Sequence, residues 1–599
     1  MRARRHPEGG SRTCGWLAAC GLSAALLGGG ASARADGNAD VGYTLLQSFL
    51  GSDLPTGAGV SVSMVEAVQG TNPNTDPYFP VSPAYVPSVA SDPPTPDDFL
   101  FGAGTDPLGV GVTFIDGSNK RANGLSGHSA GQASVIFGNL QGLAPAVTQV
   151  TVYEANHYLN SVLNTNRTTA PLPQNFRVQN HSWVGSFGET VAAEDPQNVK
   201  ALRRFDYAVD NANGGQGLTA VVGLNNFSNM PYLLSHSYNG IAVGRSDGIH
   251  STGLTRTDDP AVPGDNAYGP GRSKPDLVAP KPNAGQSIST SSSTSHVSAI
   301  ATMLHQSGAG TDAVRGETMK AILMAGATKE GFPAWTRTPS QPLDDTFGAG
   351  EVNVFHSYKI QRGGQYLGST LEPVAAAGSY GWDYQTFVQN SPLYYDFMVE
   401  EGSRAEQFSV LLTWFARVDN LNSGLPTVAN LNLALYDSSD GFLQTLGDPL
   451  AVSNSTVDNV EHIYLTDLGP GRYTLEITGD MTRDFGLAWR MEKLFDEPSA
   501  DFDQDGVVGG KDYLLWQTHF NTLLGATRAH GDADGDGDVD LDDGNVLDAA
   551  FGIPLAAMAA VRFAAQAIPE AEGWLLACLG LSAWLGPGRA ARSAPRPPR

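Results

Sequence analysis

Two acidic stretches near the C-terminus repeat a spacing of aspartates that suits a hard cation. One begins at Asp501 and the other at Asp532, and each carries carboxylates at positions 1, 3, 5 and 12 of a twelve-residue loop. Ca²⁺ takes oxygen ligands, a glycine at position 6 permits the sharp turn, and the carbonyl at position 7 adds a ligand. The pattern predicts two calcium sites, with the ligands Asp501, Asp503, Asp505, Val507 and Asp512 in the first loop and Asp532, Asp534, Asp536, Asp538 and Asp543 in the second.

Each acidic loop precedes a stretch with helical apolar periodicity, at 513–520 and at 546–551. An acidic linker is the alternative interpretation, but a linker has no reason to repeat the loop glycine. The duplicated loop, with one following helix and Asp rather than Glu at position 12, resembles the dockerins over residues 498–553. Dockerins bind cohesins, so the resemblance implies a cohesin-like protein partner.

A serine-rich segment, 289–299, follows the block Lys-Pro-Asp-Leu-Val-Ala-Pro at 274–280. Together these segments resemble the subtilisin-like serine proteases, whose pattern is K-P-D-[IL]-V-A-P followed by G-T-S. The resemblance places the nucleophile at Ser291, at the start of a helix whose free N–H groups help to stabilise a developing negative charge. Ser289 replaces the family's glycine and Ser295 replaces its proline, and we expect the first change to crowd the backbone beside the nucleophile.

A serine hydroxyl is a weak nucleophile and needs a base that is itself oriented by an acid. Gly127-His128, followed by Gly-Leu-Ala-Pro at 142–145, resembles the family's histidine block and makes His128 the base. Two carboxylates compete for the acid. Glu66 ends the apolar run 59–65 and lies 128 − 66 = 62 residues before His128, whereas Asp116 lies only 12 residues before it. We favour Glu66, because a stretch of 12 residues is tight for the intervening chain.

The family also supplies an amide donor for the oxyanion and a strand that lines the substrate pocket. The apolar run at 220–224 ends in two asparagines, of which we choose Asn225, with Asn226 as the one-residue alternative. The block at 178–185 resembles the pocket strand. It assigns substrate binding to Ser182, Trp183 and Gly185.

The elements that must position these residues alternate in type along 57–358. Short β-branched runs alternate there with helix-like stretches, which is typical of an α/β domain. From 359 onward the runs alternate apolar and polar residues at period two, which predicts an antiparallel sandwich. The expected fold is a subtilisin-like parallel sheet with helices on both faces (36–358), a jelly-roll-like β-sandwich (359–497) and a small α-helical calcium-loop domain (498–553).

The two ends of the chain have the features of targeting segments. Residues 1–35 combine arginines, a short apolar run and small residues, as a secretory signal peptide does. Residues 566–599 resemble PEP-CTERM sorting tails, with an apolar stretch shorter than a comfortable membrane span and then arginines. We therefore expect an exported bacterial protein, found outside the cell or at its surface, that touches the membrane only transiently through its tail.

Composition excludes some classes of protein. The net charge of −25 argues against binding to nucleic acid. The three cysteines, Cys14, Cys20 and Cys578, all lie near the ends, so a disulfide scaffold is excluded for the central region. The resemblance implies an endopeptidase that acts on protein or peptide substrates. The alternative is a non-catalytic surface or adhesion protein built on an eroded protease fold, and a third class, a glycosidase, lacks a paired-carboxylate signal.

Overall fold

The computed structural model describes residues 37–551, apart from residue 73 and residues 81–111, 121–124, 139–141, 188–195, 228–232, 252–267, 270–272, 281–287, 372–375, 440–446, 497 and 505–507. The predicted signal peptide, the predicted sorting tail and two predicted calcium ligands, Asp505 and Val507, lie outside the described residues. Within the described ranges, no helix combines the length and the apolar character needed to cross a membrane.

A seven-stranded parallel sheet forms the centre of the N-terminal domain. Its strands are β1 (Val62–Glu66), β2 (Thr113–Asp116), β3 (Gln149–Glu154), β4 (Val178–His181), β5 (Thr219–Gly223), β6 (Ile241–Arg245) and β7 (Leu277–Ala279). The order β2-β3-β1-β4-β5-β6-β7 puts β1 between β3 and β4, where the chain changes from one side of the sheet to the other. Ligands of open α/β sheets bind at such a switch point, beyond the carboxyl ends of the strands.

Helices cover both faces of this sheet, because its strands carry apolar residues on both sides. Along β5, Val221 packs in one core with residues of α6, α7 and α8, whereas Ala220 and Val222 pack in a second core with residues of α5. This arrangement confirms the predicted α/β class. The helices of this domain are α1 (Gly37–Asp40), α2 (Tyr43–Leu50), α3 (Gly127–Phe137), α4 (Ala155–His157), α5 (Pro196–Asp210), α6 (Thr290–Ser307), α7 (Gly316–Ala325) and α8 (Val354–Gly363), with shorter helical segments at Gly51–Asp53, Tyr158–Val162, Ala212–Gly214, Leu233–His236 and Asp312–Val314.

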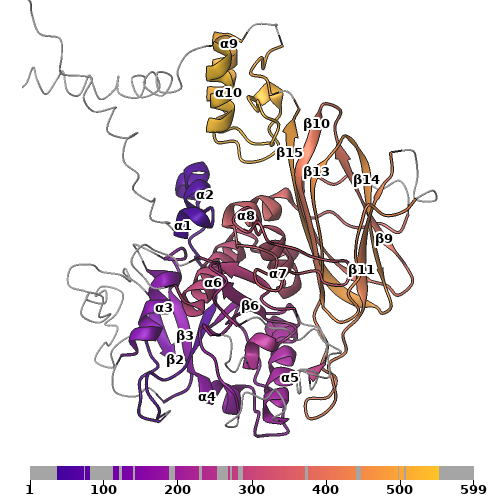
Figure 1. The fold of residues 1–599 in the computed structure, drawn as a ribbon. Coiled ribbons are helices and arrows are strands. Elements are labelled where there is room, and N and C mark those ends of the chain that lie inside the picture. Colours follow the sequence, from indigo (N-terminus) through magenta and orange to yellow (C-terminus); the bar gives the residue numbers. More distant parts are fainter. Residues whose placement is uncertain are drawn as a thin grey trace, which may run out of the picture.

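The second domain is an antiparallel sandwich beside α7 (Figure 1). One sheet has the order β13-β10-β15-β8 and the other has the order β12-β11-β14-β9. Alternate residues of both sheets meet in one apolar core, as their period-two pattern predicts. The strands are β8 (Tyr380–Phe387), β9 (Leu393–Val399), β10 (Ser403–Thr413), β11 (Leu431–Asp437), β12 (Ala451–Ser453), β13 (Val460–Leu468), β14 (Gly471–Gly479) and β15 (Arg483–Phe495).

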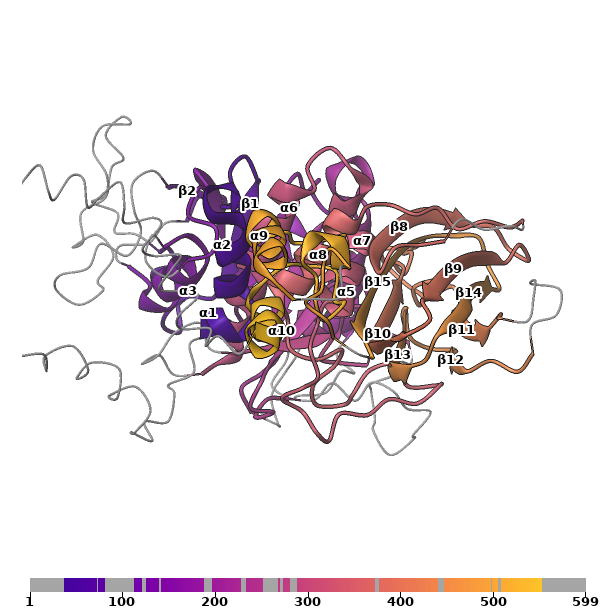
Figure 2. The ribbon, with the colours of Figure 1, turned by 90° about the horizontal axis from the view of Figure 1, so that it is seen from above.

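The C-terminal module contains α9 (Gly510–His519), the short helix Arg528–His530 and α10 (Leu541–Phe551). Figures 1 and 2 place this module next to α8 and the end of β15. Helix α8 continues past the boundary expected at residue 358, because Tyr358 and Ile360 pack in the main core of the first domain. The sandwich strands begin at Tyr380.

Candidate active site

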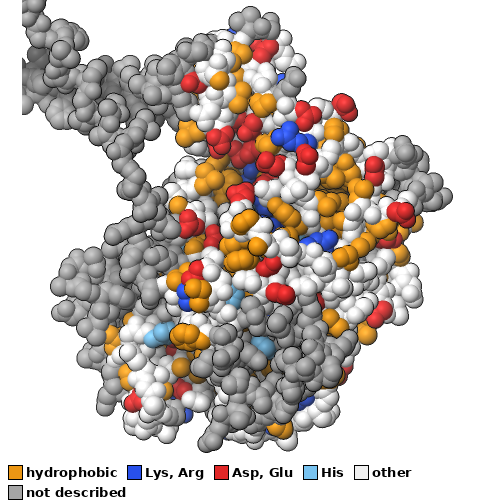
Figure 3. All heavy atoms as spheres, viewed as in Figure 1, with side chains coloured by type: hydrophobic (Ala, Val, Ile, Leu, Met, Phe, Trp, Pro, Cys, Tyr) orange, Lys and Arg blue, Asp and Glu red, His pale blue; other side chains and the backbone are white. Residues whose placement is uncertain are grey.

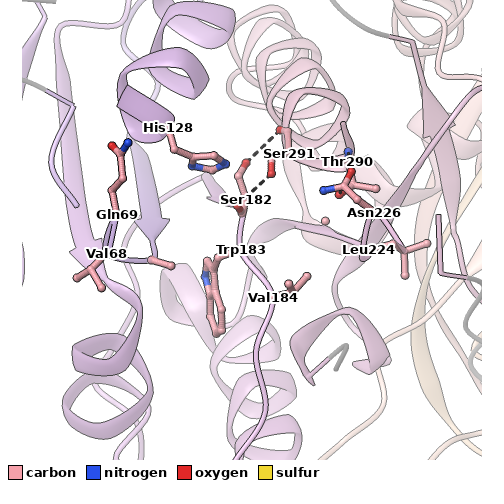
Figure 4. A pocket seen from close by; sticks show the side chains of 12 residues that line it. Val68, Gln69, His128, Ser182, Trp183, Val184, Leu224, Asn226, Thr290 and Ser291 are labelled. Carbon is pink, nitrogen blue, oxygen red and sulfur yellow. Dashed lines mark hydrogen bonds between the residues drawn. The ribbon is translucent and has the colours of Figure 1, made fainter. Parts of the chain in front are cut away.

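A carboxylate and an imidazole meet at the switch point of the sheet. Glu66 is the last residue of β1, and its Oε2 lies 2.9 Å from Nδ1 of His128, the second residue of α3. The Glu66 side chain is fully buried, whereas 42% of the His128 side chain is exposed. With Nδ1 bonded to the acid, the second ring nitrogen is left for the cavity, and Figure 4 shows the imidazole directed toward Ser182 and Ser291.

Burial and the acid act in opposite directions on His128. Burial lowers the pKa of His128, the hydrogen bond and the charge of Glu66 raise it, and the pKa settles above its ordinary value. The pKa of Glu66 is also raised, because the loss of water around this fully buried carboxylate outweighs the contact with His128. The acid therefore makes His128 a stronger base, which suits general-base catalysis.

The competing carboxylate, Asp116, lies at the end of the edge strand β2. Its Oδ1 accepts hydrogen bonds from the hydroxyl of Tyr78 at 2.5 Å and from the backbone N–H of Ser118 at 2.9 Å. Its Oδ2 accepts one from the backbone N–H of Lys120 at 3.0 Å. Donors from nearby loops thus hold Asp116, and the carboxylate beside His128 is that of Glu66.

The predicted nucleophile, Ser291, is the second residue of α6. Its hydroxyl donates a hydrogen bond to the carbonyl of Ser182 at 3.3 Å. The preceding Ser289 is the N-cap of α6, with φ −148° and a hydroxyl that accepts from the N–H of Ser292 at 3.2 Å. The extended backbone at Ser289 does not need glycine, and serine is a favoured N-cap. The expected crowding beside the nucleophile therefore does not occur.

A buried polar network takes the place of the family's proline at Ser295. The hydroxyl of Ser295 donates to Oε1 of Gln132 on α3 at 2.9 Å and lies 3.3 Å from the hydroxyl of Ser182. The amide of Asn180 donates to that same Ser182 hydroxyl at 2.9 Å, and Ser298 donates to Asn180 at 2.9 Å. Satisfied networks of this kind rigidify a core. This network connects α3, β4 and α6, the elements that carry His128, Ser182 and Ser291.

These residues line a cavity of about 370 Å³. Two of the predicted substrate-binding residues, Ser182 and Trp183, are in its wall, and the third, Gly185, is not. Among the described residues of the wall, His128 is the one titratable side chain, and none of the others carries an acidic or basic group. The wall consists of Ala67, Val68, Gln69, His128, Ser182, Trp183, Val184, Gly223, Leu224, Asn226, Thr290 and Ser291.

The amide in the cavity wall belongs to Asn226, the one-residue alternative to Asn225. Oδ1 of Asn226 accepts from the backbone N–H and the hydroxyl of Thr290, at 2.8 and 3.3 Å, which ties this asparagine to the first residue of α6. Figure 4 shows its amide nitrogen on the side that faces Ser291. Asn225 is buried instead, and its Oδ1 accepts from the N–H of Phe227 at 3.0 Å.

Gln69 is a further residue of the site that the sequence did not suggest. Its Oε1 accepts the backbone N–H of Gly127 at 2.6 Å, and its side chain lines the cavity beside His128 (Figure 4). Gly127 is the first residue of α3, where backbone N–H groups have no partner within the helix. The end of β1 and the segment after it therefore hold His128 at two points, through Glu66 at the ring and through Gln69 at the preceding residue. No sequence pattern pairs Gln69 with Gly127, since their contact arises from the fold.

The Lys-Pro-Asp block next to the serine-rich segment has a structural role. The buried carboxylate of Asp276 lies 2.7 Å from Nζ of Lys274 and 3.0 Å from Nζ of Lys320 on α7. It also accepts the N–H of Ala242 on β6 at 2.7 Å. Burial raises the pKa of Asp276 but the two lysines lower it further, so the net shift is downward. Burial lowers the pKa of Lys274 to about 8. This cluster joins β6, α7 and the chain that enters β7.

In the described parts of the two acidic loops, the carboxylate at position 12 makes matching contacts. In the first, Asp512 accepts hydrogen bonds from the N–H groups of Phe502 at 2.8 Å and Gly509 at 2.7 Å, which are loop positions 2 and 9. In the second, Asp543 accepts from the same positions, from Ala533 at 2.6 Å and Asp540 at 2.7 Å. The carboxylates at position 12 therefore close both loops in the same way.

The donors in these loops fit a hard cation. One oxygen from each member lies within 4.8 Å of the others in three groups: Asp501, Asp503 and Asp512; Asp532, Asp534 and Asp536; and Asp538, Asp540 and Asp543. Oδ1 of the buried Asp538 has no hydrogen-bond partner among the described residues. An all-oxygen donor set with an unsatisfied buried carboxylate oxygen is compatible with Ca²⁺.

Comparison with known proteins gives a limited result. No model of a protein family matches the sequence, and no curated protein matches it. Among solved structures, the chain resembles MycP1 with its N-terminal propeptide removed, at 17% identity over 54% of this chain and 95% of that chain, with a TM-score of 0.28. It also resembles tripeptidyl peptidase 2, at 11% identity over 62% of this chain and 40% of that chain, with a TM-score of 0.24. A pre-peptidase C-terminal domain of a Bacillus anthracis collagenase matches at 12% identity over 18% of this chain and 85% of that domain, with a TM-score of 0.13.

The solved structures that the chain resembles thus include serine proteases, since MycP1 is described as one. At these identities and TM-scores, the likeness says nothing about the activity of this chain.

Proposed function

We propose that this chain is a serine endopeptidase in which Ser291 attacks a peptide carbonyl and His128 takes up the proton of its hydroxyl. One observation carries the proposal. His128, whose Nδ1 lies 2.9 Å from Oε2 of the buried Glu66, and Ser291 line one cavity at the switch point of the parallel sheet. An acid, an imidazole and a hydroxyl in this arrangement are the components of acyl transfer by a serine hydrolase.

Each group has a defined task in this proposal. Glu66 holds the tautomer of His128 that leaves its second nitrogen free to accept a proton. The amide of Asn226 and the N-terminal N–H groups of α6 donate to the oxyanion that forms on the substrate. Ser291 has to turn from the Ser182 carbonyl, to which it donates at 3.3 Å, in order to transfer its proton to His128.

Covalent labelling with a fluorophosphonate tests the proposal directly. We expect the purified protein to be labelled, and we expect Ser291→Ala to abolish the labelling. Ser292→Ala is the matched control, because this neighbouring serine belongs to the same helix but not to the cavity wall. If correctly folded protein is not labelled with calcium present, the activity is absent, and the alternative of a non-catalytic surface scaffold replaces the proposal.

The finer parts of the proposal concern calcium, location and partners. Calcium would be held by the carboxylates of the two C-terminal loops, where it would supply a rigid oxygen-coordinated centre for folding. The repeated contacts at loop position 12 support this part. A calcium titration followed by circular dichroism should show a response below the millimolar range, and a flat titration would remove calcium from the proposal.

Export, the cleavable tail and a cohesin-like partner follow from the terminal segments and from the likeness of 498–553 to dockerins. Proteolytic fragments of the mature protein, identified by mass spectrometry of the secreted fraction, would test the two processing sites. A substrate peptide or protein is required by the peptidase proposal itself.

A further inference from the structure

The second acidic loop is fastened to the first domain by a buried ion pair. Nζ of Lys359, on α8, lies 3.0 Å from Oδ2 of Asp538, at position 7 of the loop. Only 2% of the lysine side chain and 4% of the aspartate side chain are exposed. The same ammonium lies 4.6 Å from the ring centre of Tyr380 and 5.2 Å from that of Phe355, which completes its enclosure.

Further contacts hold this loop against the rest of the chain. The N–H of Phe495, at the end of β15, donates to the carbonyl of Asp534 at 2.5 Å, and the guanidinium of Arg528 stacks 4.5 Å from the Phe495 ring centre. Leu523 and Leu524, in the link between the two loops, pack against the main core of the first domain. Figure 3 shows acidic side chains gathered where the module meets the body of the protein.

The first loop has a different counter-charge. In the described part of this loop, Nζ of Lys511 lies 3.2 Å from Oδ2 of Asp503, and the Lys511 side chain is 76% exposed. An exposed pair of this kind contributes little to stability, whereas breaking a buried pair leaves a charge without compensation. The two loops therefore differ in how strongly their ion pairs involve the rest of the chain.

An ion can reach the second loop without undocking it. Asp532 and Asp536 line a cavity of about 440 Å³ between the module and the sandwich, with Tyr366 and Tyr380 in the same wall. Calcium would neutralise two charges of a loop that contains seven aspartates between 532 and 543, so the loop would stay acidic and attractive to Lys359.

We propose that the second loop is a calcium-dependent clamp that fastens the C-terminal module to the peptidase domain through the Asp538–Lys359 pair. The inference rests on the proposed calcium binding. Asp538 connects the calcium ion to α8. Position 7 of such a loop presents its backbone carbonyl to the ion, while the carboxylate of Asp538 binds Lys359 on α8. Ordering of the loop by calcium fixes this carboxylate, and by linkage the docked domain in turn favours the calcium-bound loop.

The experiment combines calorimetric calcium titration of the full chain with its thermal unfolding, which is monitored by tryptophan fluorescence. Calcium at 100 times its dissociation constant shifts a coupled unfolding equilibrium roughly 100-fold. Lys359→Met and Asp538→Asn both remove the ion pair, and Asp538→Asn keeps the position-7 carbonyl. Lys493→Met is the matched control. Lys493 pairs with Glu400 beside the same cavity, and among the described residues it forms no hydrogen bond with a carboxylate of the loop.

We expect both test variants to bind calcium at two sites and to lose most of the calcium-induced shift in unfolding, whereas Lys493→Met should keep it. A full calcium-induced shift in either Lys359→Met or Asp538→Asn would overturn the clamp. A wild-type protein that binds no calcium in the calorimeter would instead remove the calcium proposal on which the clamp depends, so the two failures are distinguishable.

Discussion

Replacing Glu66 by Gln tests the unusual acid of the proposed triad. The change keeps the volume of a fully buried side chain but removes the charge that lies 2.9 Å from Nδ1 of His128. A glutamine can present either its oxygen or its NH₂ group to the ring. The variant therefore loses both the fixed tautomer of His128 and the stabilisation of the imidazolium that forms during the reaction.

The structure sets the size of the effect. Neutralising the equivalent acid costs on the order of 10⁴ in turnover in a well-studied serine protease. The His128 side chain is 42% exposed, so solvent screens part of the charge interaction, and we expect a loss of about 10³-fold. The pKa of His128 should fall in the variant, because burial lowers it and the contact that raises it is gone. The acid limb of the pH–rate profile should therefore move to lower pH.

The assay measures the rate of fluorophosphonate labelling, and of peptide hydrolysis, between pH 4 and pH 9. Glu154→Gln is the matched control. Glu154 lies opposite Glu66 in the register of β1 and β3, is equally buried, and caps α4 rather than contacting His128. We expect that control to lose stability rather than rate. The reasoning is refuted if folded Glu66→Gln protein reacts within about threefold of wild type, or if Asp116→Asn rather than Glu66→Gln abolishes labelling.

Three other predictions follow from the site. Asn226→Ala removes a proposed oxyanion donor and should lower kcat roughly 10²–10³-fold. Asn225→Ala is the control and should affect thermal stability more than kcat. Equal kcat losses in the two variants would contradict the assignment. Gln69→Leu frees the N–H of Gly127 and should lower kcat more than it changes KM, with Gln69→Glu restoring the acceptor and most of the rate. Asp276→Asn leaves two buried lysines without their carboxylate and should cost about 3–5 kcal/mol in urea unfolding at pH 7. Because the folded pKa of Asp276 is depressed, its stabilisation exists above the ordinary carboxylate pKa of about 4 and is lost as pH falls through the folded value, so wild type and variant should converge in acid.

The two departures from the protease pattern around the nucleophile have local explanations. Serine at 289 is compatible with an extended backbone and caps the nucleophile helix through its hydroxyl. Ser295 stands where the protease pattern has proline, and its hydroxyl donates a hydrogen bond to Gln132 on the helix that carries His128. Both substitutions keep the helix start in place by hydrogen bonds, so neither argues by itself against activity.

The sequence alone was sufficient to predict the α/β class, the sandwich and the helices after the acidic loops, because these depend on local periodicity. Strand β11 carries such an alternation, and its buried and partly exposed residues follow each other in turn as a half-buried sheet requires. The residues Ser291, His128 and Glu66 could be picked out because their motifs are continuous in sequence, although nothing in the motifs shows that the three side chains meet.

Only the tertiary structure decided between neighbours and between distant partners. Asn225 and Asn226 follow the same strand, and which of the two faces the cavity depends on the turn after β5 and on the position of Thr290 in space. Glu66 rather than Asp116 lies beside His128, because β1 lies at the switch point while β2 lies at the edge of the sheet. The Lys359–Asp538 contact joins residues 179 positions apart, and no local pattern encodes a pairing that packing alone brings about.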